Sequence, residues 1–155
     1  MKTIKIIALF AATLSIGLIS SCSKDDSTNS TTTTDARDLV IGNYSGIEIS
    51  TDASDSTDSD TVLFTISKGA GTSLIINQDG VSINTSAVVV AGKDLAGNIP
   101  TQTLTVDGVS FSIQGRGNNN EHFGFMESTK AFTYDFQVND GPLAGYKVMV
   151  FGTKK

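Results

Sequence analysis

The residue with the clearest covalent chemistry is Cys22, the only cysteine among the 155 residues. A single thiol cannot form a disulfide within the chain or supply the paired cysteines of a typical zinc site. The chain reaches Cys22 through a short basic start at residues 1–5, an apolar run at residues 6–19, and two serines. This order is typical of a secretory signal peptide. The apolar run is shorter than the roughly 20 residues of a membrane-spanning helix, so a cleaved signal is favoured over a permanent span.

The four residues Ile19-Ser20-Ser21-Cys22 resemble a lipobox, the site cut by lipoprotein signal peptidase. The resemblance implies that residues 1–21 are removed, that Cys22 becomes the first residue, and that its sulfur carries a diacylglyceryl group. Each buried methylene contributes about 0.8 kcal/mol, so two or three acyl chains on one residue give a stable anchor. We therefore expect attachment to a membrane through Cys22. Ordinary secretory cleavage nearby, which would leave a free thiol, is the alternative.

The residues after the cysteine suggest where in the cell the protein is located. The run Ser23-Lys24-Asp25-Asp26 resembles the surface-export signal of Bacteroidota lipoproteins, a lysine followed by two acids. It implies an outer-membrane lipoprotein that faces outward; a merely solvated start of a linker is the alternative. Residues 27–34 contain no apolar side chain, so residues 22–37 are predicted to be a lipidated, Ser/Thr-rich tether.

The charge balance excludes one class of partner. The chain carries 11 basic and 16 acidic residues, a formal charge of −5. Loss of Lys2 and Lys5 with the signal peptide makes it more negative still. An acidic surface repels phosphate backbones, so we expect no nucleic-acid partner. It is not attracted to anionic lipid either, so membrane attachment depends on the acyl chains.

His122 is the only histidine and the one candidate for acid–base catalysis. A histidine acts as a general base only when an acid orients it beside a nucleophile. The neighbouring Glu121 and Glu127 form no recognisable catalytic motif with it. We expect a structural or surface histidine, no enzymatic activity and no cofactor.

Four aspartates form the only candidate metal site. Calcium prefers clustered carboxylate oxygens, and the loop between the first two predicted strands contains Asp52, Asp55, Asp58 and Asp60. Their spacing does not fit the EF-hand pattern. A solvated acidic loop without metal is therefore the favoured interpretation.

The remaining chain, residues 38–155, has the alternation of β-strands. Apolar and polar residues alternate with a period of two, which is typical of strands buried on one face, at residues 62–67, 109–114, 132–138 and 146–151. Asp107-Gly108 predicts a two-residue hairpin in which Leu104 faces Phe111 and Thr105 faces Ser110. Asp79-Gly80 predicts another, in which Ile76 faces Ile83. Gly46 is predicted to be a bulge, because Tyr44 and Ile47 lie on opposite parity.

The strand pattern predicts an all-β domain. No segment has a long helical period, and about eight or nine short strands are separated by turn signals. A series of hairpins with few long crossovers favours a small antiparallel up-and-down β-barrel over a sandwich, because a barrel has no exposed strand edges.

Two segments carry a family resemblance. Residues 39–46 (LVIGNYSG) and the last strand, residues 146–155, are similar to the calycin-like, or lipocalin-like, domains of Bacteroidota lipoproteins. Gly42 and Tyr44 occupy the Gly-x-aromatic position at which lipocalins carry tryptophan. The resemblance implies a barrel over residues 38–155, often built around an apolar cavity, and it implies no particular ligand.

A barrel of this kind suggests a binding module for a small apolar ligand or a partner. The residues expected to face its interior are large and apolar: Phe64, Phe111, Phe132, Tyr134 and Phe136. The alternative is a structural or interaction lipoprotein, an accessory of a surface complex or an adhesin. In that case the same side chains fill the barrel and leave no room for a ligand.

Overall fold

The computed structural model describes residues 35–116 and 121–155. The predicted signal peptide, the lipidated Cys22, the export signal Lys24, Asp25 and Asp26, and the tether up to Thr34 lie outside the described residues.

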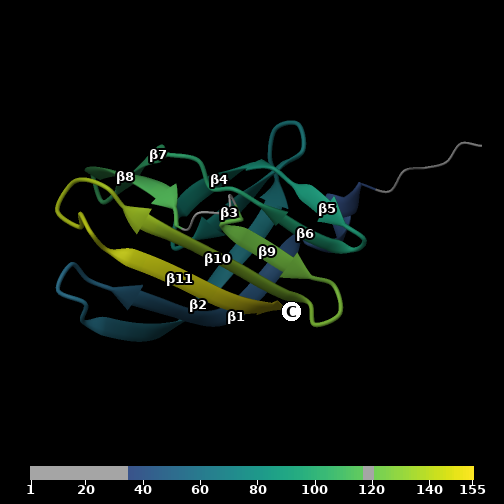
Figure 1. Cartoon of the computed structure of the whole chain (residues 1–155), viewed down its shortest axis with the longest axis horizontal. Helices are drawn as coiled ribbons and strands as arrows, with labels where there is room; N and C mark the ends of the chain where they lie inside the picture. Colours follow the sequence, from purple (N-terminus) through teal and green to yellow (C-terminus); the bar gives the residue numbers. More distant parts are fainter. Residues whose placement is uncertain (1–34, 117–120) are drawn as a thin grey trace, which may run out of the picture. The chain divides into compact units, whose positions relative to one another are not determined.

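The described residues form one antiparallel sheet of eleven strands, preceded by one 3-10 turn (Figure 1). The bounds are η1 Ala36–Leu39, β1 Gly42–Thr51, β2 Thr57–Lys68, β3 Ser73–Gln78, β4 Val81–Ala87, β5 Val89–Ala91, β6 Asp94–Gly97, β7 Gln102–Val106, β8 Val109–Gly115, β9 Phe123–Met126, β10 Ala131–Val138 and β11 Lys147–Lys154. The sheet is nearly closed, so the predicted all-β barrel is confirmed. The number of strands exceeds the predicted eight or nine, because strands as short as β5 and β6 show too little alternation.

The two halves of the sheet are connected differently. The first half is a simple meander in which β4, β3, β2 and β1 lie side by side. The last strand, β11, pairs with β1 and so joins the two halves of the sheet. In the second half β10 has two partners on one side: β9 along its first residues and β8 along its last ones. Beyond β9 lie β6 and β5, and β7 pairs with β8.

Both predicted hairpins are confirmed residue by residue. Around Asp107-Gly108, Leu104 pairs with Phe111 and Thr105 with Ser110, and the two hydroxyls lie 2.9 Å apart in a hydrogen bond. Asp107 and Gly108 both have positive φ angles, 49° and 80°, as a two-residue turn of this kind requires. Around Asp79-Gly80, Ile76 pairs with Ile83 as predicted.

The predicted bulge at Gly46 is wrong. β1 keeps a continuous register on both sides, and Gly46 pairs with Val62 of β2 and with Gly152 of β11. Glycine at this position allows β1 to lie close to the backbone of β11, because a Cβ at Gly46 would lie 1.9 Å from the Phe151 carbonyl oxygen. With this unbroken register Tyr44 and Gly46 lie on the inner face of β1, and Ile47 is exposed on the outer face.

The side-chain amide of Gln102 connects β7 to β4 by hydrogen bonds. The Asn84 N–H donates to Gln102 Oε1 at 2.9 Å, and Gln102 Nε2 donates to the Asn84 carbonyl oxygen at 2.8 Å. One glutamine thus satisfies both main-chain groups that a neighbouring strand would otherwise bond. Nearby, the Ser86 N–H donates to the Asn98 carbonyl oxygen at 2.8 Å. These bonds connect strands that no continuous ladder joins.

The aromatic part of the core fills the end of the barrel next to η1. Tyr44, Phe64, Phe123, Phe132 and Tyr134 form a cluster of buried aromatic rings, which we call the aromatic cluster. The hydroxyl of Tyr44 donates to the Val40 carbonyl oxygen at 2.6 Å, and Val40 itself is fully buried just after η1. Within the described residues, the strands and the buried core belong to one compact unit, and such a unit can fold by itself.

Candidate functional site

The end of the barrel opposite η1 is where a cavity can form. Because the strands are antiparallel, the C-terminal ends of β1 and β10 meet there with the N-terminal ends of β4 and β11. The aromatic cluster does not extend to this end. The inward residues here leave space between the strands.

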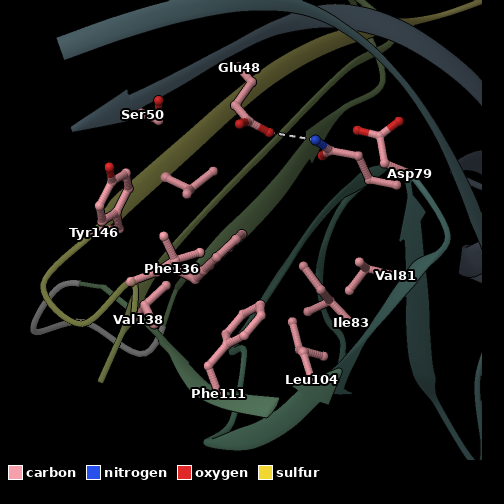
Figure 2. Close-up of a pocket in the computed structure, with 13 residues that line it drawn as sticks. Glu48, Ser50, Asp79, Val81, Ile83, Leu104, Phe111, Phe136, Val138 and Tyr146 are labelled. Atoms are coloured by element: carbon pink, nitrogen blue, oxygen red, sulfur yellow. Dashed lines mark hydrogen bonds between the residues drawn. The ribbon is translucent and has the colours of Figure 1, made fainter. Parts of the chain in front are cut away.

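An open cavity of about 320 Å³ occupies this end of the barrel (Figure 2). Such a volume lies at the lower limit of the range for small-molecule sites, about 300–1,000 Å³. Most of its wall is apolar, formed by Val81, Ile83, Leu104, Phe111, Phe136, Val138, Leu143, Tyr146 and Val148. The polar part of the wall consists of Glu48, Ser50, Gln78 and Asp79.

The polar side chains of the wall are connected to the buried core. The Tyr134 hydroxyl donates to Gln78 Oε1, and Gln78 Nε2 donates to Glu48 Oε2. Tyr134 is 2% exposed. Burial, and after it the charges of Glu48 and Asp79, raise the pKa of Tyr134 well above its ordinary value, so its hydroxyl stays protonated and donates. These two successive hydrogen bonds fix the carboxylate of Glu48 at the cavity wall.

The five residues predicted to face the interior lie in two different parts of the barrel. Phe111 and Phe136 line the cavity. Phe64, Phe132 and Tyr134 lie in the aromatic cluster, where their rings pack against one another and against Tyr44. All five belong to the core or pack against it, but only two of them reach the open end.

Sequence reasoning missed the polar residues of the cavity, above all Glu48 and Gln78. A signal for Glu48 was present. It lies four residues after Tyr44 and therefore on the same face of β1. An acidic residue at an inward position of a barrel strand indicates a polar feature in the interior.

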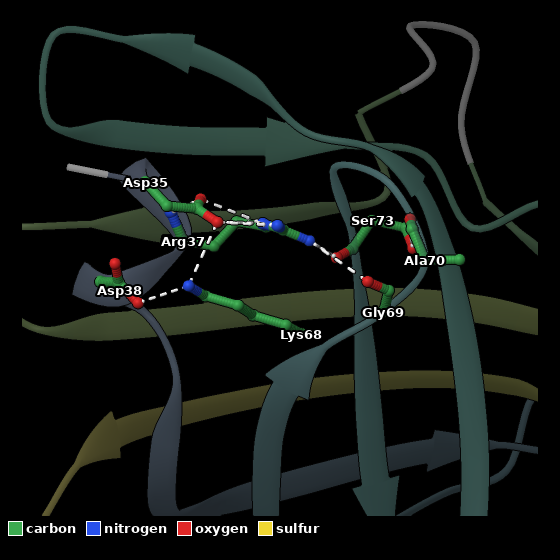
Figure 3. Close-up of polar contacts among 7 residues, drawn as sticks. All are labelled: Asp35, Arg37, Asp38, Lys68, Gly69, Ala70 and Ser73. Carbon is green, nitrogen blue, oxygen red and sulfur yellow. Dashed lines mark hydrogen bonds and ion pairs between the residues drawn. The ribbon is translucent and has the colours of Figure 1, made fainter. Parts of the chain in front are cut away.

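A cluster of ion pairs lies at the opposite end, around η1 (Figure 3). Asp35 Oδ2 is 2.7 Å from Arg37 Nη2, and Lys68 Nζ is 2.7 Å from Asp38 Oδ1 and 3.2 Å from Asp35 Oδ2. Arg37 Nη1 also donates to the Ser73 carbonyl oxygen at 3.0 Å. The bonds from Arg37 hold the pKa of Asp35 well below its usual range. Residues 35–37, which the sequence pattern places in the tether, thus fasten η1 to the start of β3.

His122 is a buried part of the barrel wall, next to β9. Its Nδ1 accepts a hydrogen bond of 3.3 Å from the Ile99 N–H, and its side chain leaves no room for a Cβ at Gly115, which would lie 2.0 Å from Nδ1. Burial raises the pKa of the nearby Asp135 carboxyl, an effect that the charges of Arg116 and His122 oppose. Neither His122 nor Asp135 lines the cavity, so neither can act on a molecule bound there.

The four aspartates of the candidate calcium site are not brought together. Asp52 Oδ1 accepts from the N–H groups of Ser54 and Ser56 at 2.8 and 2.9 Å. Asp55 lies 3.3 Å from Lys147 Nζ. In residues 35–116 and 121–155, no three His, Cys, Asp or Glu side chains are grouped so that they could hold a metal ion.

The cavity combines an apolar wall with a fixed carboxylate. Its apolar wall excludes water from a bound molecule, and Glu48 supplies a fixed hydrogen-bond acceptor at one side.

In the described part of the chain, no helix is long and apolar enough to cross a membrane. Neither the protein-family models nor the curated proteins compared with the chain include a match.

Proposed function

We propose that the barrel is a binding module for a small, largely apolar molecule, carried by a lipoprotein anchored through Cys22 at the outer face of the outer membrane. The cavity of about 320 Å³ carries the first part of this proposal. The second part rests on the sequence of residues 1–26.

The cavity is preformed, because most of its wall belongs to paired strands. Ile83, Leu104 and Val138 are buried even without a ligand, and they are located on three paired strands. A preformed site costs little ordering on binding, so more of the interaction free energy appears as affinity. Burial of apolar ligand surface contributes roughly 25 cal/mol per Å² before the costs of association.

Filling the cavity should weaken binding strongly. Leu104 is 7% exposed and lines the cavity, so the larger side chain of Leu104→Trp is expected to occupy the ligand's space. We expect the affinity for an uncharged apolar dye, N-phenylnaphthylamine, to fall by about tenfold or more. The measurement is fluorescence titration of the chain from Ser23 onward, which retains the complete barrel.

Leu63→Trp is the matched control, because Leu63 is 60% exposed on the outer face of β2. It should leave the affinity within about twofold of the parent value. Val148→Phe, which narrows the same cavity from β11, is the second test if Leu104→Trp does not fold. Equal dye binding by parent, cavity-filled and control proteins would contradict the proposal. Absence of binding by the parent would favour the alternative, an interaction lipoprotein without a small ligand.

The anchor requires the sulfur of Cys22. Because this is the only thiol in the chain, Cys22→Ser removes the only residue that can carry the diacylglyceryl group. We expect the parent protein to fractionate with membranes, with an intact mass equal to a chain that starts at Cys22 plus lipid. The serine variant should lose both properties. A parent chain with a free thiol would refute the lipid anchor and leave the binding proposal untouched.

A further inference from the structure

We propose that the ligand is an amphipathic cation, in which an ammonium group binds Glu48 and an apolar tail fills the rest of the cavity. This inference rests on the proposed binding function and specifies the class of ligand. It follows from the charges of the wall, the direction of its hydrogen bonds and the position of its polar side.

The charged groups of the wall have one sign. Of the 13 residues that line the cavity, Glu48 and Asp79 are acidic and none is lysine, arginine or histidine. Among the ion pairs of residues 35–116 and 121–155, none includes Glu48 or Asp79. Their charge is therefore not neutralised by a basic side chain in this part of the protein. A ligand cation would supply the missing partner.

The direction of the hydrogen bonds leaves acceptors for the ligand. The Tyr134 hydroxyl donates a hydrogen bond to Gln78 Oε1, and Gln78 Nε2 donates one to Glu48 Oε2. Glu48 Oε1 has no hydrogen-bond partner among the described residues. An ionised carboxylate only accepts hydrogen bonds, so a ligand group that replaces water at this oxygen must be a donor. An ammonium group has three donors and a charge of the required sign.

The polar and apolar parts of the wall face each other. Figure 2 shows Glu48 on one side of the cavity and Phe111 and Leu104 on the other. A ligand with its head at Glu48 can therefore extend its tail toward Leu104. The small volume favours a compact ligand over a long acyl chain.

An anion would be rejected by the same groups. A ligand carboxylate at this position would lose its hydration and face Glu48 without a compensating cation, which is unfavourable at a partly buried site. A neutral alcohol would still bury its tail and donate one hydrogen bond. The expected order of affinity is therefore ammonium, then alcohol, then carboxylate.

The test compares three probes with the same tail: octylammonium, octanol and octanoate. Titrations of the chain from Ser23 onward, followed by NMR at the methyl groups of Ile83, Leu104 and Val148, report binding in the cavity. We expect octylammonium to bind about tenfold more tightly than octanol, and octanoate to bind more weakly than octanol. Glu48→Gln should reduce the ammonium-to-alcohol ratio to about one while octanol affinity changes by less than about twofold.

Glu127→Gln is the matched control. It removes the same charge with the same replacement from a residue that pairs with Lys130, away from the cavity, and the preference for octylammonium should persist. Equal binding of the ammonium and the alcohol by the parent would overturn the cation inference and leave the proposed binding function standing. A preference that survives Glu48→Gln would also overturn it. No binding of any probe would overturn both proposals.

Discussion

Gly46→Ala is expected to destabilise the barrel by roughly 3 kcal/mol or more, at the upper end of the cost of overpacking. A Cβ at this position would lie 1.9 Å from the Phe151 carbonyl oxygen and 2.6 Å from the Gly152 Cα. Both contacts are with the backbone of β11, which cannot rotate away as a side chain can. The substitution must therefore separate β1 from β11, the pair that joins the two halves of the sheet.

The measurement is urea denaturation of the Ser23 chain, compared with Gly124→Ala as a matched control. Gly124 also lies within a strand, but its Cβ would meet nothing closer than 3.8 Å. We expect Gly124→Ala to shift the free energy of unfolding by less than about 1 kcal/mol, in either direction. Similar midpoints for the two variants would show that β1 and β11 are not held as closely as the structure indicates.

The fate of Gly46 illustrates what local sequence can and cannot predict. The hairpins at Asp107-Gly108 and Asp79-Gly80 were predicted correctly, because their turn residues and paired side chains are neighbours in the sequence. The neighbour that makes Gly46 necessary is Phe151, more than a hundred positions later. Nothing near Gly46 reveals that contact. The change of parity in β1 was consequently explained by a bulge that the structure does not have.

The same limit applies to the site. Alternation along a strand tells which side chains point inward, and Phe64, Phe111, Phe132 and Phe136 are all buried or partly buried. It does not tell how far along the barrel axis each one lies. That depth depends on pairings such as Val138 with Ile113, which connect distant parts of the chain. The distinction between a filled core and a cavity therefore required the three-dimensional arrangement.

Phe132→Ala should have a similarly large effect, a loss of about 3–5 kcal/mol. Phe132 is 0% exposed. Its ring centroid lies 5.8 Å from those of Tyr44 and Phe123 and 6.2 Å from those of Phe64 and Tyr134. Truncation would remove contacts with four rings and leave a hole that strands on every side prevent from collapsing. For a domain of ordinary stability, about 5–15 kcal/mol, this is a large fraction of the total.

Two further variants separate loss of packing from loss of a ring as such. Phe151→Ala removes the same side chain from the outer face of β11, where it is 44% exposed, and should cost less than about 1 kcal/mol. Phe132→Leu keeps most of the buried volume and should cost clearly less than Phe132→Ala in the same urea titration. Equal losses for Phe132→Ala and Phe151→Ala would mean that the aromatic cluster is not the core. Because Phe132 lies outside the cavity wall, the Phe132→Leu variant should also bind N-phenylnaphthylamine with the affinity of the parent protein. The end of the barrel next to η1 then provides stability, while the opposite end remains free to bind a ligand.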